Sequence, residues 1–322
     1  MVVHCKKSKF DQYIGRPGPW GNPFQMTSEA DRPRVIEQFE AWGRDQPWLR
    51  DAARRELAGK TLGCWCSPRP CHGDVLKAWA SDPNPQWTFV FGSNRAGRHG
   101  KGAALEAVNA HGAEYGVGSG LTGNAYALPT KDEQLRTLPI DEIREEAERL
   151  TAFAAQNPER HFMLTRVGCG LAGYRDEEIA PLFVSAPSNI HLPGRWRQLL
   201  DPTETARIVV CGSRSFEDEK RAEAILERAS ERFEGNMEIV SGGARGADTL
   251  GEDFAVASGI RFVRFPPLWN SLGKRAGMAR NLTMLWYGTH VIAFWDGKSR
   301  GTKGTIDAAK AEGIPVWIPG PG

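Results

Sequence analysis

Three times in the last third of the chain, a run of strand-forming residues ends in a glycine-rich turn that opens a helical pattern. These runs are RIVVCGSRSF at 207–216, MEIVSGGARGAD at 237–248 and THVIAFWDGKSRGTKGT at 289–305. Two more strand-like runs, at 260–266 and 314–319, give five strands that alternate with four helical segments. This alternation predicts a doubly wound parallel sheet, with ligand-binding loops at the carboxyl ends of its strands.

The three glycine turns have the composition of an anion-binding edge. Glycine and other small residues let backbone N–H groups approach a ligand, and the following helix N-terminus adds partial positive charge. Arg214, Arg245 and Arg280 carry guanidinium groups that suit phosphate or carboxylate. One such turn often only joins a strand to a helix, but three along one sheet predict a binding site.

The segments GSRSFED, SGGARGAD, GKRAGMARN and IAFWDGKSRGT resemble the YspA-like branch of the SLOG superfamily over nearly all of 206–322. That superfamily also holds the Lonely Guy phosphoribohydrolases and DNA-processing protein A. The resemblance implies a Rossmann-like fold that binds nucleotides or nucleotide-derived ligands. The ligand-binding residues it implies are Gly212, Ser213, Arg214, Ser241, Gly242, Gly243, Gly246, Asp248, Arg280, Asn281, Ser299, Gly301, Thr302, Gly304 and Thr305.

The same segment departs from the phosphoribohydrolases at one position. Those enzymes carry a catalytic glutamate shortly after the glycine–threonine loop, where this chain has Asp307. The departure favours binding over hydrolysis in this segment. The ARN triplet at 279–281 also resembles the segment by which DNA-processing proteins hold single strands, so a nucleic-acid role stays open.

The middle of the chain, 86–200, repeats the strand, glycine loop and helix pattern. Its GSN at 92–94, GRHGKGAA at 97–104 and GCGLAGY at 168–174 resemble the loops of a macrodomain, which implies ADP-ribose or a relative as ligand. The ligand-binding candidates are Gly92, Ser93, Asn94, Gly100, Gly102, Gly168, Gly170, Gly173 and Tyr174, the last stacking on a sugar or ring. Asn94 and His99 are catalytic candidates, although His99 is equally interpreted as a solvated loop residue. Cys169 is either a reactive thiol at a helix start or a small residue between glycines.

The stretch GCWCSPRPCHGD at 63–74 gathers three cysteines and a histidine. A strand is expected over KTLGCWC at 60–66, with Cys64 and Cys66 near its end. A helix is expected to begin at Cys71 and His72. Zinc or an iron–sulfur cluster held by Cys5, Cys64, Cys66, Cys71 and His72 is one interpretation. A site without metal, with His4, Cys71, His72 and Asp74 as catalytic candidates, is a second, and simple packing of a turn is a third. A disulfide is not expected in a reducing compartment.

FDQYIGRPGPWGNPF at 10–24, dense in glycine, proline and aromatic residues, is expected to be a loop. Its part IGRPGPWGNPF at 14–24 supplies Arg16, Trp20, Asn22 and Phe24, which suit a small polar ligand such as a base or ribose. This loop, HCKK at 4–7 and GCWCSPRPCHGDVL at 63–76 resemble an uncharacterised domain family of bacteria and phages, over about 1–82. The resemblance brings no known chemistry.

Composition excludes several classes of protein. A formal net charge of +2 gives no bulk cationic field, so nucleic acid is not the favoured partner. No apolar run has the length of a membrane span, and the first residues lack the apolar core of a signal peptide, so we expect a cytoplasmic protein.

Proline-bearing stretches at 81–86 and 199–205 predict three α/β domains at 1–82, 86–200 and 206–322. The oligomeric state stays open, a homo-oligomer included.

Three hypotheses for the whole chain follow. The first is an enzyme that binds and processes a nucleotide-derived ligand related to ADP-ribose or NAD, or a nucleoside phosphate, as a hydrolase or transferase at an N-glycosidic bond. The second is a non-catalytic sensor or sponge for a nucleotide-derived signal in bacteria–phage conflict. The third is a nucleic-acid-binding or base-modification accessory protein, which a steep salt dependence of binding would mark.

Overall fold

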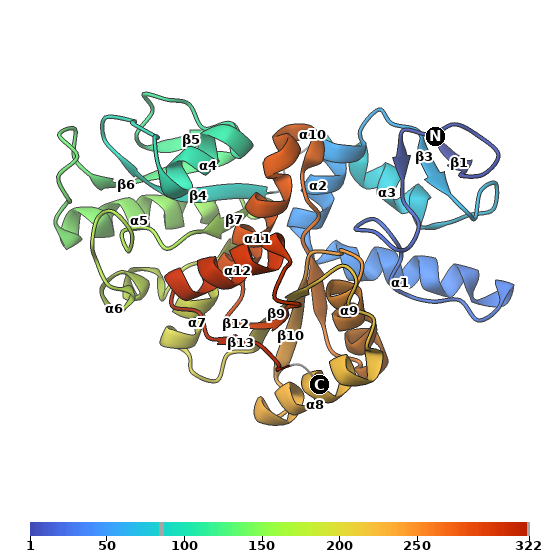
Figure 1. Ribbon diagram of the computed structural model, residues 1–322. Coiled ribbons are helices and arrows are strands. Elements are labelled where there is room, and N and C mark those ends of the chain that lie inside the picture. Colours follow the sequence, from blue (N-terminus) through green and yellow to red (C-terminus); the bar gives the residue numbers. More distant parts are fainter. Residues whose placement is uncertain (84–86, 321–322) are drawn as a thin grey trace. The chain divides into compact units, whose positions relative to one another are not determined.

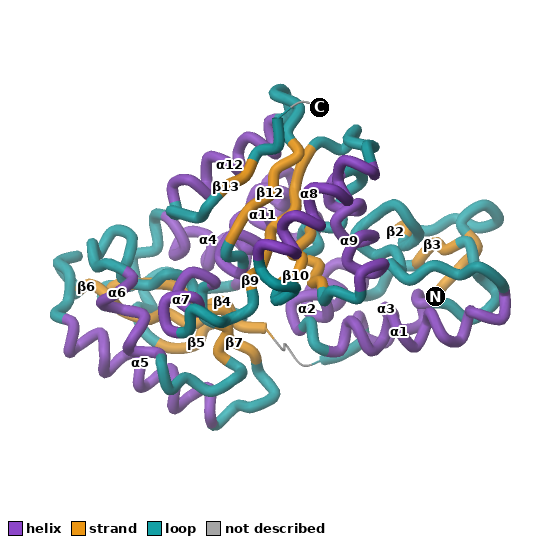
Figure 2. The backbone as a smooth tube through the Cα atoms, turned by 90° about the horizontal axis from the view of Figure 1, so that it is seen from below, coloured by secondary structure: helices purple, strands orange, loops and turns teal. Residues whose placement is uncertain are grey.

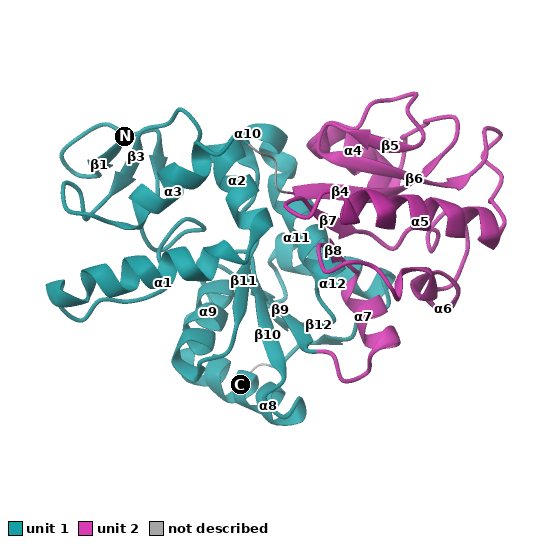
Figure 3. Ribbon diagram, turned by 180° about the vertical axis from the view of Figure 1, so that it is seen from behind, with its two compact units in different colours: residues 1–83, 205–322 teal, residues 84–204 magenta. Residues whose placement is uncertain are grey.

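The computed structural model describes residues 1–83 and 87–320 and divides the chain into two compact units (Figures 1 and 3). Unit 1 joins residues 1–83 with 205–322, and unit 2 spans 84–204. Residues 84–86 of the predicted linker at 81–86 lie outside the described residues. The three segments each contain one sheet, which confirms the predicted α/β class.

Unit 1 begins with a small sheet and three helices. These elements are β1 (Val2–His4), β2 (Gln12–Tyr13), η1 (Glu29–Asp31), α1 (Arg32–Arg44), α2 (Pro47–Leu57), β3 (Leu62–Cys64) and α3 (His72–Ala80). The strands pair in the order β1-β3-β2, and both pairings are parallel. The sequence predicted a loop over the whole of 10–24, which is wrong at β2, because Gln12 and Tyr13 pair with Leu62 and Gly63 of β3.

The second part of unit 1 is the predicted doubly wound sheet. Its elements are β9 (Ala206–Gly212), α8 (Glu219–Arg232), β10 (Met237–Ser241), α9 (Ala247–Ser258), β11 (Phe262–Arg264), α10 (Trp269–Leu272), η3 (Gly273–Arg275), α11 (Ala276–Tyr287), β12 (His290–Phe294), α12 (Arg300–Ala311) and β13 (Val316–Trp317). The strand order is β11-β10-β9-β12-β13, and every pairing is parallel. This order confirms the Rossmann-like prediction and puts the reversal of winding between β9 and β12.

Helices cover both faces of that sheet (Figure 2). Helix α8 packs beside α9, and α11 packs beside α12. The buried stripe of α8, Ala222, Ile225 and Leu226, lies in the core with Ile208 and Ile239 of the neighbouring strands. These residues recur at the spacing that puts them on one face of a helix.

Side chains of α1 and α2 cover the open edge of the C-terminal sheet. Strand β11 is the edge strand, so one side of its backbone has no strand partner. The indole Nε1 of Trp42 donates to the carbonyl of Phe262 at 2.9 Å, and Nε1 of Trp48 donates to the carbonyl of Arg264 at 3.1 Å. The backbone N–H of Arg264 donates to Oε1 of Gln46 at 2.8 Å. Three polar side chains therefore satisfy the edge, which explains why the first and last segments form one unit.

Unit 2 contains a five-stranded sheet with the order β5-β6-β4-β7-β8, in which only the β5–β6 pairing is antiparallel. Its elements are β4 (Trp87–Asn94), α4 (Gly102–His111), β5 (Gly120–Thr122), β6 (Ala125–Lys131), α5 (Ile140–Ala155), β7 (His161–Leu164), α6 (Asp176–Ile179), η2 (Ala180–Phe183), β8 (Ile190–His191) and α7 (Gly194–Leu200). Ile143, Ala147 and Leu150 of α5 recur at helical spacing and lie in the core. The macrodomain resemblance stays a prediction.

The helices in the described part of the chain include none that is both long and apolar enough to cross a membrane.

Candidate functional site

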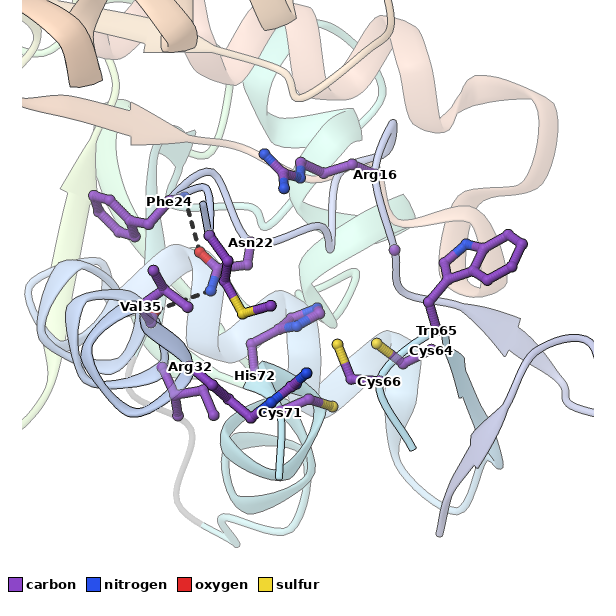
Figure 4. A pocket seen from close by; sticks show the side chains of 13 residues that line it. Arg16, Asn22, Phe24, Arg32, Val35, Cys64, Trp65, Cys66, Cys71 and His72 are labelled. Atoms are coloured by element: carbon purple, nitrogen blue, oxygen red, sulfur yellow. Dashed lines mark hydrogen bonds between the residues drawn. The ribbon is translucent and has the colours of Figure 1, made fainter. Parts of the chain in front are cut away.

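A pocket of about 320 Å³ lies in the N-terminal part of unit 1, beside the cysteine stretch (Figure 4). It is formed by the loop after β2, the start of α1, the end of β3 and the start of α3. Its lining residues are Gly15, Arg16, Asn22, Phe24, Met26, Arg32, Val35, Ile36, Cys64, Trp65, Cys66, Cys71 and His72. Two guanidinium groups and three thiols in one pocket favour an anionic ligand, a metal ion or both.

Three thiols and one imidazole gather at one wall of this pocket. The sulfur atoms of Cys64 and Cys71 and a ring nitrogen of His72 all lie within 4.8 Å of one another, and these three residues are buried. Figure 4 shows the sulfur atoms of Cys64, Cys66 and Cys71 close together beside the His72 ring. The predicted helix start is confirmed at Cys71 and His72, but β3 ends at Cys64, so the prediction that the strand reaches Cys66 is wrong.

The thiols share one negative charge. Hydrogen bonds from the Cys64 and Cys71 thiols, with a contribution from the Arg32 guanidinium, hold the pKa of Cys66 well below its ordinary value. The same contacts raise the pKa values of Cys64 and Cys71. Without a bound cation, Cys66 is therefore the thiolate of the group.

His72 is held in one tautomer. Its Nε2 lies 2.9 Å from the backbone carbonyl of Ile14, and since a carbonyl only accepts, Nε2 carries the proton and Nδ1 has the lone pair. Burial lowers the pKa of His72, which keeps the ring neutral. A neutral imidazole with a fixed tautomer is the form that binds metals.

The remaining candidates of this segment have structural contacts. Asp74 accepts from the backbone N–H of Cys71 at 3.0 Å in the capping box of α3, so its carboxylate is engaged. Asn22 donates to the Val35 carbonyl and accepts from the Phe24 N–H, each at 2.9 Å. His4 pairs with Cys64 in the sheet and meets the Trp65 ring edge-on at 6.1 Å.

Cys5 and Arg32 differ from the sequence prediction. The backbone N–H of Cys5 donates to the Cys64 carbonyl at 3.0 Å, but its thiol is not in the group of clustered ligand atoms among the described residues. Sequence reasoning missed Arg32, which lines the pocket from the first turn of α1. No local signal marks it, because its proximity to the cysteines comes from the packing of α1 on α3.

The glycine loops of unit 2 follow neighbouring strands. Strands β4 and β7 pair in parallel, so the loops at 95–101 and 165–175 leave the same edge of the sheet. A Cβ added at Gly92 would lie 3.6 Å from the Gly168 nitrogen. Gly168 and Gly173 have φ values of 77° and 85°, which side chains rarely adopt. The exposed Gly100 and Gly102 sit at the start of α4.

Asn94 and His99 hold the first of these loops in place. Asn94 donates to the Arg98 carbonyl at 2.8 Å and accepts from the Arg98 N–H at 3.0 Å. His99 is 2% exposed, so its interpretation as a solvated residue is wrong. Its Nε2 donates to the Val117 carbonyl at 3.0 Å, and the hydroxyl of Ser93 donates to the Gly118 carbonyl. These contacts order the loop around its glycines.

Tyr174 and Cys169 belong to the second loop. The Tyr174 hydroxyl donates to the Leu138 carbonyl at 2.7 Å, so its polar end is engaged within the protein. Burial, with the charge of Asp176, raises the pKa of Cys169 to about 12. The Cys169 thiol is therefore protonated near neutral pH, which favours the packing interpretation over a reactive thiol.

The predicted loops of the C-terminal sheet meet at the carboxyl ends of β9, β10 and β12. The Ser213 N–H donates to the Phe294 carbonyl at 3.1 Å, which joins the first loop to the third. A Cβ at Gly246 would lie 2.3 Å from the Ser213 carbonyl oxygen, so the first and second loops touch where glycine alone fits. The Ser241 hydroxyl is engaged within the second loop, since its Oγ accepts from the Gly243 N–H at 3.0 Å and donates to the Asp248 carbonyl at 3.5 Å.

Two helices begin at these loops without a side-chain cap. Helix α9 has Gly246 as its N-cap and α12 has Ser299, and neither position makes a side-chain capping bond. The Ser299 hydroxyl lies instead 2.9 Å from that of Thr302. Backbone N–H groups of an uncapped first turn attract anions. Gly301 in the first turn of α12 is exposed, with no atom within 4 Å of an added Cβ.

Arg280 lies beneath the second loop. A Cβ at Gly242 would lie 1.4 Å from its Nη1, so a larger residue there would require the guanidinium to move. Nη1 is buried, has no hydrogen-bond partner among the described residues, and lies 3.8 Å from Oδ2 of Asp248. Burial raises the pKa of Asp248 to about 6, against the effect of Arg280. The second loop therefore packs against the Arg280 guanidinium, and the Asp248 carboxylate balances the positive charge of this group only in part.

The other predicted residues divide into two groups. Asn281 accepts from Arg280 Nε and donates to Thr305, both at 2.7 Å, which links α11 to α12. Arg214 and Arg245 have exposed side chains, and Nε of Arg245 donates to the Arg214 carbonyl at 3.2 Å. The exposed pair is free to move toward a ligand, whereas the Arg280–Asn281–Thr305 chain is part of the scaffold. Gly212 is the last residue of β9, where the first loop begins, and Gly304 lies within α12.

Comparisons with known families match both ends of unit 1. Residues 3–82 match a domain of unknown function, DUF4326. Residues 206–271 match the YspA, cpYpsA-related SLOG family, which confirms the predicted family of this segment and indicates a nucleotide-related ligand.

Two phage proteins are similar in sequence. The gene 61 protein of Mycobacterium phage D29 is 36% identical over 118 residues, covering 34% of this chain and 93% of that protein. An uncharacterised 12.4 kDa protein from the nrdA-td intergenic region of Enterobacteria phage T4 is 35% identical over 83 residues, covering 23% of this chain and 71% of that protein. Among solved structures, DNA processing protein A from Streptococcus pneumoniae is 22% identical at a TM-score of 0.30. This match covers 43% of the chain but only 59% of that structure, and it adds no argument about function.

Proposed function

This chain belongs to the same family as the gene 61 protein of Mycobacterium phage D29, and from its SLOG match at 206–271 we propose that it binds a nucleotide-derived ligand at the carboxyl ends of β9, β10 and β12. The observation that carries the proposal is the pair of uncapped helix N-termini, α9 and α12, at one edge of the sheet. Their backbone N–H groups suit a phosphate, and the buried charge of Arg280 raises the local potential.

The ligand is proposed to place its phosphate at the start of α12 and its remaining groups over the first two glycine loops. Arg214 and Arg245 are exposed on those loops and have the geometry to pair with a second phosphate or a carboxylate. ADP-ribose, an NAD relative or a nucleoside phosphate has this chemistry.

A binding role for this segment, rather than hydrolysis, is supported by Asp307. Its carboxylate pairs with Lys303 Nζ one turn earlier at 2.5 Å, and both side chains are more than half exposed, at 58% and 57%. A carboxylate on the outer face of α12 is poorly placed to activate water at the loops. This contact favours the sensor or sponge hypothesis for residues 206–322.

Processing of the ligand is the second candidate function, and we propose the N-terminal pocket as its site. Arg16, Arg32 and the Cys66 thiolate lie in that pocket and favour an anionic substrate. Because Asp74 and Asn22 are already engaged, the groups available for chemistry at an N-glycosidic bond, in the chain without a bound metal, are Cys66 and His72.

One experiment tests both functions. The purified chain is incubated with NAD, ADP-ribose, cyclic ADP-ribose and nucleoside monophosphates, and chromatography reports which compound is bound and which is consumed. Gly301→Asp is expected to weaken binding at least tenfold, because it puts a carboxylate where the phosphate is proposed to lie. The same change leaves the fold intact, since a negative charge stabilises a helix N-terminus by about 0.3–1 kcal/mol.

Gly301→Asn is the matched control, because it has the same size without the charge and is expected to keep most of the affinity. Equal affinities of the two variants contradict the site. Binding that falls steeply with salt for single-stranded DNA, and no binding of free nucleotides, supports the nucleic-acid hypothesis instead.

A further inference from the structure

We propose that the N-terminal domain binds one zinc ion through the sulfur atoms of Cys64, Cys66 and Cys71 and Nδ1 of His72. The site would close one wall of the pocket in Figure 4. It is independent of the nucleotide site proposed on the C-terminal sheet.

The spacing of the ligand atoms fits a tetrahedral ion. Zinc–sulfur and zinc–nitrogen bonds of about 2.3 and 2.1 Å in a tetrahedron put the ligand atoms roughly 3.5–3.8 Å apart. The sulfurs of Cys64 and Cys71 and a His72 ring nitrogen already lie within 4.8 Å of one another. Cys66 is outside this group of three, but its thiol lines the same pocket and lies beside the other two sulfurs in Figure 4. A side-chain rotation of Cys66 would complete the coordination.

The surroundings of the ligands are those of a metal site. The Nε2–H of His72 donates to the Ile14 carbonyl at 2.9 Å, which fixes the ring and leaves Nδ1 for a metal. The backbone N–H of Gly73 donates to Cys71 Sγ at 3.3 Å, and Cys71 is the N-cap of α3. Both features stabilise negative charge on that sulfur.

Charge balance also supports a divalent ion. Three thiolates and Zn²⁺ leave a net charge of −1, and the guanidinium of Arg32 lies beside Cys66 to neutralise it. Arg32 is held in place by Glu29 and by the Pro70 carbonyl, to which its Nη1 donates at 3.1 Å.

Zinc fits these ligands better than an iron–sulfur cluster. A [4Fe–4S] cluster takes four cysteine thiolates, and the fourth that the sequence offers, Cys5, does not line this pocket, whereas Cys64, Cys66 and Cys71 do. Three thiolates and one imidazole around a single ion form a common structural zinc set. The short C-x-C spacing is accommodated because Cys64 ends β3, whereas Cys66 lies in the following turn.

The test is the metal content of the full-length protein, purified without chelators or a histidine tag from zinc-supplemented cells. We expect about one zinc per chain by plasma mass spectrometry, as for a single structural site. Replacement by Co²⁺ is expected to give the near-ultraviolet charge-transfer band of thiolate ligation. Cys71→Ser and His72→Gln are expected to lose the metal, whereas Cys5→Ser and Cys169→Ser, the matched cysteine controls, keep it.

Circular dichroism and nucleotide binding of each variant show whether the chain is folded, so that loss of metal is not confused with loss of structure. If a variant does not fold, thiol counting on the wild type decides: three of its six cysteines are expected to become reactive only when a chelator removes the zinc. The proposal is overturned if the wild-type protein contains no zinc and takes up no Co²⁺. It is also overturned if mild unfolding exposes all the thiols to reagent and releases no metal. Iron with acid-labile sulfide overturns it too.

Discussion

Arg264 of β11 forms a buried ion pair with Glu252 of α9 and also binds the N-terminal loop to the C-terminal sheet. The side chains are only 3% and 5% exposed, and Arg264 Nε donates to Glu252 at 2.9 Å while Nη2 bonds the second carboxylate oxygen. The remaining nitrogen, Nη1, donates to the carbonyls of Pro19 and Gly21, at 3.2 and 2.7 Å. The guanidinium also lies over the Trp42 ring, 5.0 Å from its centroid.

Arg264→Met removes the guanidinium but keeps an apolar chain of similar length. It leaves the Glu252 carboxylate buried without its partner, and removal of one member of a buried pair costs about 3–5 kcal/mol. We therefore expect the free energy of unfolding to fall by that amount. Urea denaturation followed by tryptophan fluorescence is a suitable assay, because Trp42 and Trp48 lie at this interface.

The double variant Arg264→Met, Glu252→Leu is expected to recover most of the loss, since apolar replacement of a buried pair is often close to neutral. Lys303→Met is the control, because its ion pair with Asp307 is exposed and is worth about 1 kcal/mol or less. A loss from Arg264→Met no larger than that of the control, or a double variant no more stable than the single one, would refute this reasoning.

Two further predictions concern the second glycine loop. Gly243→Ala is expected to destabilise unit 1 more than Gly259→Ala in urea denaturation: both residues have a φ of 65°, but a Cβ at Gly243 would lie 2.9 Å from the Pro19 Cα, whereas one at Gly259 meets nothing within 4 Å. Since the pKa of Asp248 is raised from 3.8 to about 6, the folded chain takes up this proton before the unfolded chain does. The contribution of Asp248 to stability therefore rises as the pH falls from above 6 toward 4, by on the order of 2–3 kcal/mol, and an anionic ligand binds more tightly over the same range. Asp248→Asn is expected to flatten both pH profiles, and unchanged profiles would contradict the assignment.

The C-terminal sheet could be predicted from the sequence because each of its units repeats one local pattern. A strand-forming run, a glycine turn and an amphipathic helix fix the winding once the right-handed crossover rule is applied. The short strand β2 could not be predicted in this way. Gln12 and Tyr13 lie in a segment of glycine, proline and aromatic residues without alternation, and only their pairing with β3 makes them a strand.

The cysteine site was predictable in part. The positions of Cys64, Cys66 and Cys71 at a strand end and a helix start follow from local pattern, and the sequence alone brought them near His72. The exclusion of Cys5 from the cluster depends on the register that pairs His4 with Cys64. The presence of Arg32 depends on how α1 packs against α3. Neither the register nor the packing has a signal in the neighbouring residues.

The contacts around Pro19 change how the two candidate sites of unit 1 are understood. The sequence treated the loop at 14–24 and the glycine loop at 241–246 as parts of separate domains. In the structure, Arg264 binds the carbonyls of Pro19 and Gly21, and Gly243 has room only for a hydrogen where it meets Pro19. The same N-terminal loop carries Arg16 and Asn22 into the pocket beside the cysteines. Because one segment lines the first site and supports the second, a substitution that displaces it, Arg264→Met included, must disturb both.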